Sequence, residues 1–248
     1  MRAPLFALVT SLAACGGTQT TPPETLSSHA SEPIAPRDTP APRVLWRDNA
    51  FGTEGLPAVA RQSEITVVPV HESDGGRGYP NIRFEVRDRN DKTIQTIAVM
   101  TSNEYEKLAP DGVPTTALQQ KLASANAELA KLHAIHDLLV MKELALQKPP
   151  DGSDEHLAIG DNLDVDWEKD HLHVFPHNTD HALATADGHR WLAPAHSPTS
   201  PQPDCENPAF LAAVYHAPSI NVVVAQIRYH GTDTCWEPGD QLHVIAWY

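Results

Sequence analysis

Histidine is the residue whose number and spacing most directly suggest chemistry in this chain. Six of its fourteen histidines fall in one short stretch, and they are His171, His173, His177, His181, His189 and His196. If residues 171–175 form a strand, His171 and His173 point to the same face. Two neutral imidazoles so placed can chelate zinc, copper or nickel, and His177 or His181 would supply a third ligand from the following loop. The alternative is a solvent-exposed polar face, because the spacing matches no closed zinc pattern.

Carboxylates lie close to the first of these histidines. They are Asp161, Asp164, Asp166, Glu168 and Asp170. An EF-hand calcium loop does not fit, because Lys169 stands where that loop needs glycine and Phe175 where it needs the bidentate glutamate. The chain also lacks a serine between glycines at a strand-to-helix turn, a phosphate-binding glycine loop and a zinc-protease histidine pair. No catalytic residue is therefore assigned.

The N-terminus has the pattern of an export signal. A single positive charge at Arg2 is followed by an apolar run over Leu5–Val9 and by small residues before Cys15. The apolar run is far shorter than the ~20 residues that a membrane-spanning helix needs, and no later segment reaches that length. We therefore expect a cleavable signal peptide over residues 1–14 and a mature protein that does not span a membrane.

The residues Leu12-Ala13-Ala14-Cys15 resemble the lipobox of bacterial lipoproteins. The resemblance implies that Cys15 receives a diacylglyceryl thioether, that the signal is cut before it, and that the new amine is acylated. Several acyl chains together make a stable membrane anchor. Gly16 stands where a retention aspartate would sit, which implies an outer-membrane destination with the domain in the periplasm or at the cell surface. The alternative is an ordinary secretory signal with an incidental cysteine.

Residues 16–42 are mostly Gly, Thr, Pro, Ser, Glu and Ala, with almost no large apolar side chain. Such a segment cannot bury enough surface to fold. In a polyproline-like state, at about 3.1 Å per residue, it would hold the following domain some tens of ångströms from the bilayer. The expected organisation is a signal peptide over 1–14, a lipidated disordered tether over 15–42 and a single globular domain over 43–248.

Charge limits the partners of this domain. The 248 residues carry 18 Lys and Arg against 32 Asp and Glu, which gives a formal net charge of −14 at pH 7. An acidic domain is repelled by nucleic acid and by anionic lipid. We therefore expect membrane attachment through the lipid anchor only, an envelope protein as candidate partner, and no nucleic acid.

Cys205 and Cys235 are the cysteines that remain after lipidation of Cys15. An even pair in an exported protein predicts a disulfide bond. Closing a loop of about 31 residues would add roughly 3 to 4 kcal/mol of stability in the chain-entropy model. The alternative, two free thiols acting as metal ligands or as a nucleophile, is disfavoured in an oxidising compartment.

Strand patterns lie on both sides of one long helical pattern. Residues 64–70, 81–88 and 92–100 are rich in β-branched residues or alternate in polarity, and turn residues separate them, which predicts an antiparallel meander. Further strands are expected over 164–167, 172–175, 182–185, 190–192, 221–229 and 241–248, with a hairpin turn at 186–188. The segment 209–215 is interpreted as a short helix.

Apolar residues recur at three- and four-residue spacing from Leu118 to Leu144, which predicts an amphipathic helix of about 30 residues. Thr116 with Gln119 resembles a capping box at its start. The expected fold is therefore α+β, an antiparallel β-sheet domain packed with one long amphipathic helix after a disordered N-terminal tether. A β-propeller is disfavoured, because no repeat of ~40 residues recurs. The order of an Asp-Gly-rich loop, a strand pair and a long Ala/Leu-rich helix is weakly similar to uncharacterised predicted secreted proteins of bacteria. This similarity implies no activity.

The sequence thus favours a surface-tethered lipoprotein whose domain is a non-enzymatic binding or interaction module of the cell envelope, with no cofactor. The alternative is a metal-binding or metal-dependent protein that holds a divalent transition metal in the hairpin from His171 to His181. A hydrolase whose catalytic residues are dispersed along the chain stays open as a third hypothesis, without a motif in its favour.

Overall fold

A computed structural model of the chain describes residues 39–62, 64–73, 78–147, 156–160, 162–168, 171–188, 209–217, 219–229 and 239–248. The chain divides after Arg37, and the described residues all belong to the unit Asp38–Tyr248. The predicted signal peptide, and the predicted tether up to Asp38, lie outside the described residues. Within the described ranges, no helix combines the length and the apolar character needed to cross a membrane.

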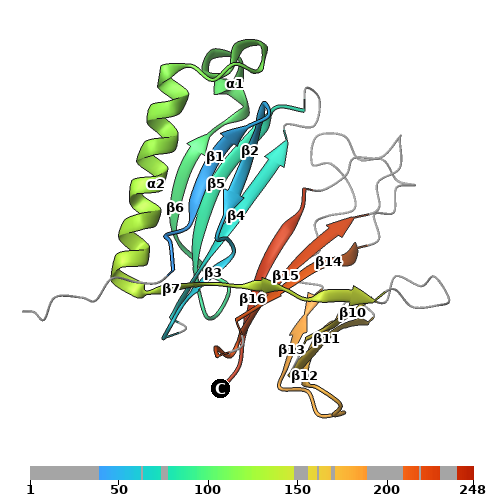
Figure 1. The fold of residues 1–248 in the computed structure, drawn as a ribbon. Coiled ribbons are helices and arrows are strands. Elements are labelled where there is room, and N and C mark those ends of the chain that lie inside the picture. The colour runs from blue at the N-terminus through green and yellow to red at the C-terminus, as the bar shows by residue number, and fades with distance from the viewer. Residues whose placement is uncertain are drawn as a thin grey trace, which may run out of the picture. The chain divides into compact units, whose positions relative to one another are not determined.

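The first sheet is built around the predicted meander. Its strands are β3 (Ala58–Ala60), β4 (Ile65–Ser73), β5 (Pro80–Asp88), β6 (Thr93–Met100) and β7 (Leu138–Val140), in the order β6-β5-β4-β3-β7. All neighbouring strands are antiparallel, so the predicted meander of β4, β5 and β6 is confirmed (Figure 1). A separate hairpin of β1 (Arg43–Arg47) and β2 (Ala50–Glu54) precedes this sheet.

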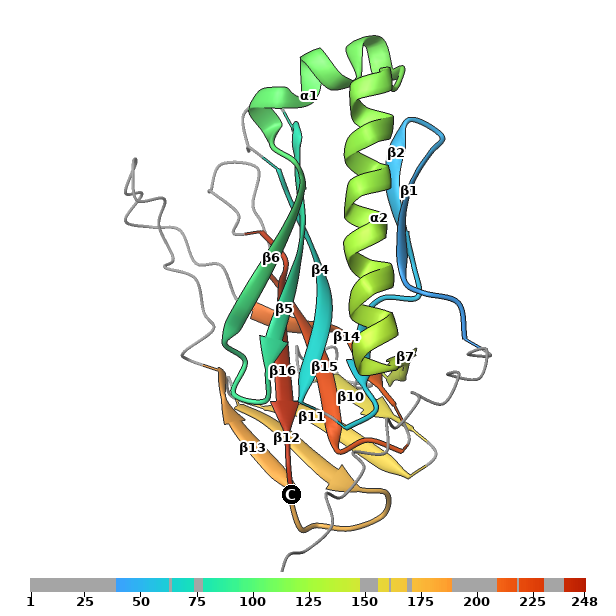
Figure 2. The ribbon, with the colours of Figure 1, turned by 90° about the vertical axis from the view of Figure 1, so that its left-hand side faces the viewer.

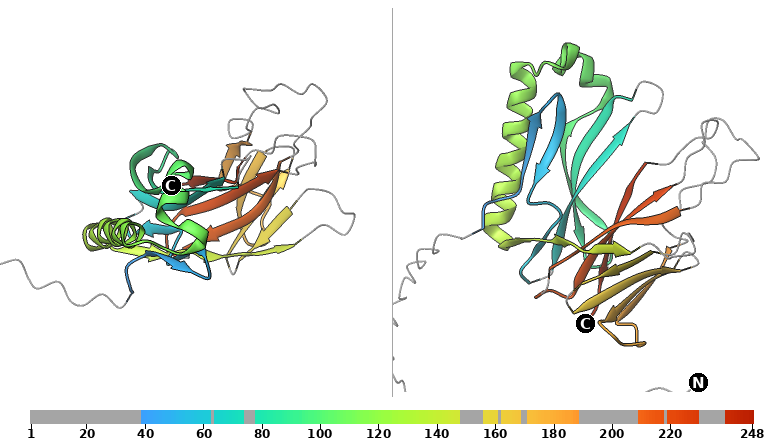
Figure 3. Two further views of the ribbon diagram at one scale, coloured as in Figure 1. Left: turned by 90° about the horizontal axis from the view of Figure 1, so that it is seen from above. Right: turned by 45° about the vertical axis from the view of Figure 1, so that its right-hand side comes forward.

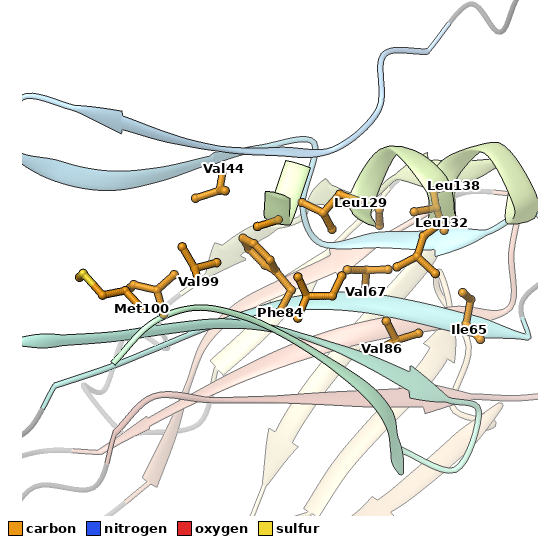
Figure 4. Close-up of a cluster of buried hydrophobic side chains, with 14 of the residues drawn as sticks. Val44, Ile65, Val67, Phe84, Val86, Val99, Met100, Leu129, Leu132 and Leu138 are labelled. Carbon is orange, nitrogen blue, oxygen red and sulfur yellow. The ribbon is translucent and has the colours of Figure 1, made fainter. Parts of the chain in front are cut away.

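Two α-helices follow the meander. They are α1 (Ser102–Leu108) and α2 (Thr116–His136), with a 3-10 turn over Pro110–Gly112 between them. Helix α2 runs along the first sheet beside the β1–β2 hairpin (Figure 2). Its side chains Leu129 and Leu132 point toward the sheet (Figure 4).

Both ends of α2 differ from the prediction. The hydroxyl of Thr115, one residue before the predicted cap, accepts a hydrogen bond from the amide of Leu118 at 3.3 Å. The helix has 21 residues and is followed by Asp137, whose φ of 51° is left-handed. The predicted continuation to Leu144 is wrong, because β7 pairs with β3, and β8 (Lys142–Glu143) pairs with β14 (Ala209–His216). Strand pairing here outweighs the leucine spacing.

Two further antiparallel sheets complete the fold. The middle sheet has the order β16-β15-β14-β8, with β14 (Ala209–His216), β15 (Val222–Tyr229) and β16 (Gln241–Ala246). The outer sheet has the order β13-β12-β11-β10-β9, with strands β9 (Ala145–Gln147), β10 (His156–Ile159), β11 (Leu163–Glu168), β12 (His171–Pro176) and β13 (Ala184–Asp187). The described part of the chain is thus built mostly of antiparallel strands, together with the helices α1 and α2.

Two of the expectations for this half of the chain are wrong. The segment 209–215 is not helical, because β14 pairs with β15 and buries residues on both of its faces. Its alanines favour a helix, but partner strands decide its conformation. The predicted turn at 186–188 is also wrong, since Ala186 and Asp187 belong to β13 and pair with β12. The predicted strand 190–192 lies outside the described residues.

The sheets and α2 lie in layers (Figure 3). Three apolar cores fill the spaces between these layers. The first core lies between α2, β1 and the first sheet, the second between the first and middle sheets, and the third between the middle and outer sheets. Strand β15 contributes Val222 and Val224 to the second core, and Val223 and Ala225 to the third. The apolar run from Val222 to Ala225 follows from burial on both faces.

Side chains from the β5–β6 hairpin bond the backbone of β16, an arrangement we call the β16 clamp. One carboxylate oxygen of Asp91 accepts from the amide of Val244 at 2.8 Å, and the other lies 2.7 Å from His243 Nδ1. Arg87 donates to the carbonyl oxygen of Leu242. Because β16 is the outermost strand of the middle sheet, these bonds satisfy groups that a neighbouring strand would otherwise pair.

Candidate functional site

The predicted histidine pair lies on the outer sheet. In the register of β11 and β12, Asp166 stands opposite His173 and Glu168 opposite His171. Intervening residues such as Leu172 are buried in the third core, so these polar side chains share the face turned away from it. The rings of His171 and His173 have centroids 6.2 Å apart, which confirms that they lie on one face.

The structure does not bring the four candidate histidines into one cluster. His173 Nδ1 lies 3.1 Å from the hydroxyl of Thr185, and His177 Nδ1 lies 3.0 Å from Asp164. His181 is exposed in the loop before β13. Among the residues that the structure describes, no group of three His, Cys, Asp or Glu side chains is arranged to hold a metal ion. A third ligand for the metal hypothesis is therefore not found among the described residues of this region, and Asp161 and Asp170 lie outside them.

This polar face is acidic. Burial raises the pKa of Asp166, and the nearby carboxylate of Glu168 raises it further, while His173 acts in the opposite direction. Strand β13 pairs with β12, and in this pair Asp187 stands opposite His171. The described part of this face therefore consists of carboxylates and imidazoles that stand opposite one another on neighbouring strands.

The remaining candidates from the sequence lie outside the described residues. They are the lipid-attachment residue Cys15, the disulfide pair Cys205 and Cys235, and the histidines His189 and His196. Their predicted roles stay predictions.

A cleft of about 470 Å³ lies at the edge of the first core, where three parts of the chain meet. The β1–β2 hairpin, the facing ends of β4 and β5, and α1 supply its walls. Its aromatic lining residues are Trp46, Phe51, Tyr79 and Tyr105. All four are partly exposed, so their rings are accessible to a ligand. The sequence analysis did not single out any of them.

The first wall of this cleft follows from a tight hairpin turn. Asp48 and Asn49 have φ values of 53° and 61°, and positive φ at both central residues is the requirement of a two-residue turn that matches strand twist. The turn places Trp46 directly opposite Phe51. Their rings meet edge to face, with centroids 4.8 Å apart and planes at 87°.

The opposite wall is a pair of tyrosines. Tyr79, just before β5, and Tyr105, on α1, have ring centroids 4.9 Å apart and planes at 31°. The Tyr79 hydroxyl donates to Glu106 at 2.6 Å. Helix α1 is held at the end of β6 by a capping box in which Glu104 accepts from the backbone amide of Thr101 at 3.0 Å.

The lining residues that the structure describes are uncharged. Besides the four aromatic residues, it includes the amide of Asn49 and the imidazole of His71, and none of the described lining residues is Lys, Arg, Asp or Glu. Burial of part of its ring lowers the pKa of His71, against the raising effect of Asp240, so the imidazole is neutral at pH 7. The cleft thus offers aromatic surfaces and uncharged hydrogen-bonding groups.

The chain matches no protein-family model, no curated protein and no solved structure in three separate comparisons.

Proposed function

We propose that the protein is a lipid-anchored, non-enzymatic binding module of the cell envelope and that the aromatic cleft is its ligand site. In this proposal, the acyl chains on Cys15 anchor it in the outer membrane, residues 15–42 are the tether, and a Cys205–Cys235 disulfide stabilises a single α+β domain. Helix α2 is its long amphipathic helix. The lipobox-like residues and the short apolar signal support the anchor. The observation that carries the binding function is the cleft itself, lined by four partly exposed aromatic side chains.

The lining indicates the ligand class. A phosphate or carboxylate ligand would call for Lys or Arg, and a cationic ligand for Asp or Glu, and neither kind is among the described lining residues. Aromatic rings pack against the apolar faces of ligand rings. The hydroxyl group of Tyr105, the amide of Asn49 and the imidazole of His71 can form hydrogen bonds with hydroxyl groups of a ligand. A neutral saccharide presents an apolar ring face together with hydroxyl groups. We therefore assign neutral saccharides to the cleft.

Binding of neutral trisaccharides tests this assignment. Isothermal titration calorimetry and saturation-transfer NMR would use maltotriose, cellotriose and chitotriose, with trigalacturonate as an anionic comparison. We expect at least one neutral trisaccharide to bind and to be recovered uncleaved, and trigalacturonate to bind more weakly because the protein carries a net charge of −14.

Variants of Tyr105 locate the binding. Tyr105→Ala is expected to weaken binding by about tenfold, which corresponds to roughly 1.4 kcal/mol. Tyr105→Phe keeps the ring and retains most of the affinity. Tyr248→Ala is the control, since Tyr248 is fully exposed and not part of the cleft. Absence of binding by all three neutral sugars, or equal binding by Tyr105→Ala and wild type, would contradict the assignment.

A further inference from the structure

The outermost strands of the three larger sheets differ in how their backbone edges are protected. Four of them, β7, β8, β9 and β13, have only two to four residues. Strand β16 is longer, but the β16 clamp bonds its backbone. Strand β6 has eight residues and, in the described part of the chain, pairs only with β5 (Figure 2). A long strand with an open edge is a template for pairing with another chain.

The composition of β6 lacks the usual protection of such an edge. From Thr93 to Met100 the strand contains no charged residue and no proline. The ladder to β5 is irregular near both ends of β6 but regular from Gln95 to Ala98. On the face turned away from the first core, the side chain of Ile94 is 55% exposed, and Thr96 and Ala98 are exposed as well.

We propose that β6 pairs with the β6 of a second copy of this chain, antiparallel, about a twofold axis at Thr96. This pairing sets Thr96 opposite Thr96 of the other copy. It also sets the large side chain of Ile94 opposite the small side chain of Ala98 of the other copy. The first sheet then continues across both copies. Closed twofold pairing is the commonest form of self-association.

Charge is the reason for choosing a second copy and this orientation. In a chain of net charge −14, the uncharged strand is where two copies can meet with little repulsion. Lys92 precedes β6, and Glu106 follows it on α1, where the other acidic residue, Glu104, already pairs with Lys121 at 2.8 Å. Antiparallel pairing brings the Lys92 end of each strand to the Glu106 end of the other, whereas parallel pairing would align like charges.

Sedimentation of the full chain with Cys15→Ser, which removes the acylation site, tests the proposal. Over about 1 to 100 µM, we expect a reversible monomer–dimer equilibrium. Thr96→Lys places two lysines opposite each other and should raise the dimer dissociation constant roughly tenfold. Ile135→Lys is the matched control, because Ile135 is 63% exposed on α2, and it should leave the constant unchanged.

A charge-swap mixture separates loss of pairing from loss of folding. Thr96→Glu alone should also dissociate, whereas an equimolar mixture of Thr96→Lys and Thr96→Glu should form a heterodimer again. A chain that stays monomeric over the whole range would overturn the proposal. So would a dimer that Thr96→Lys and Ile135→Lys weaken equally, or variants whose mixture does not associate. Because the cleft is not part of β6, these outcomes are independent of saccharide binding.

Discussion

Replacing Arg87 by methionine is expected to destabilise the domain strongly, because Arg87 holds a buried carboxylate. Glu85 is 8% exposed between the first and middle sheets, and Arg87 donates to it from Nη2 at 2.8 Å. The same guanidinium bonds Asp91 at 2.9 Å and the backbone of β16. Removing one partner of a buried ion pair costs about 3 to 5 kcal/mol. Arg83 still donates to the other carboxylate oxygen of Glu85 at 2.9 Å, so we expect a cost toward the lower end of this range.

The effect has a pH signature. In the wild type, burial raises the pKa of Glu85, but hydrogen bonds from Arg87 and Arg83 outweigh it and hold the pKa below its ordinary value. A lowered folded-state pKa stabilises the fold above the unfolded pKa, and this contribution is lost as the pH falls through the folded pKa. In Arg87→Met, burial should prevail and raise that pKa. Its destabilisation should therefore be larger at about pH 7 than at about pH 4.

Urea unfolding followed by circular dichroism measures both effects. Arg43→Met is the control, because the Arg43–Glu54 ion pair is exposed, and its loss should cost at most about 1 kcal/mol. The double variant Glu85→Leu/Arg87→Met should cost less than the sum of its parts by roughly 1 to 3 kcal/mol. The argument fails if Arg87→Met costs no more than Arg43→Met, or if its cost is the same at both pH values.

Three further predictions concern residues singled out by the sequence. Equilibrium dialysis of the domain with zinc should show no tight one-to-one binding, and tight binding that His173→Ala abolishes would instead favour the metal hypothesis. Cys15→Ser should move the protein from the membrane fraction to the soluble envelope fraction, and normal processing with continued membrane association would count against the lipobox. Mass spectrometry without reductant should show Cys205 bonded to Cys235, and alkylation of both thiols in the native protein would remove the disulfide from this account.

The strands that the sequence predicted share a simple physical cause. Residues 65–70 and 222–227 are buried by layers on both sides of their sheets, so nearly every position is apolar. This pattern does not depend on which strands lie beside them. Strands β11 and β12 have one buried face, and their alternation is equally visible. In both cases the pattern is local, so it can be recognised without knowledge of the partner strands.

The errors arise where a distant partner decides the local structure. Strand β14 contains three alanines, which favour a helix, yet pairing with β15 on one side and β8 on the other makes it a strand. The end of α2 is decided by β3, which lies far away in the sequence and pairs with β7. No helical spacing rule contains this information.

The aromatic cleft was missed for the same reason. Its four aromatic residues come from a hairpin, a strand end and a short helix, and no fixed spacing connects them in the sequence. One local signal was available, since Asp48-Asn49 is a pair that suits a tight hairpin turn and would place Trp46 opposite Phe51. Even this signal does not reveal Tyr105, because the position of α1 depends on the whole first sheet.

Asn126 of α2 holds the β1–β2 hairpin, which is one wall of the aromatic cleft. Replacing Asn126 therefore tests whether the stability of this hairpin affects ligand binding. Its side chain accepts from the amide of Val44 at 2.7 Å and donates to the carbonyl oxygen of Val44 at 3.0 Å, so that it replaces a neighbouring strand for β1. Asn126→Ala leaves both backbone groups unpaired and should cost about 1 to 3 kcal/mol in urea unfolding. Because β1 carries Trp46, saccharide affinity should fall as well. Asn126→Asp keeps the acceptor but loses the donor and should be intermediate in both measurements, and unchanged affinity in Asn126→Ala would show that the hairpin is held by other contacts.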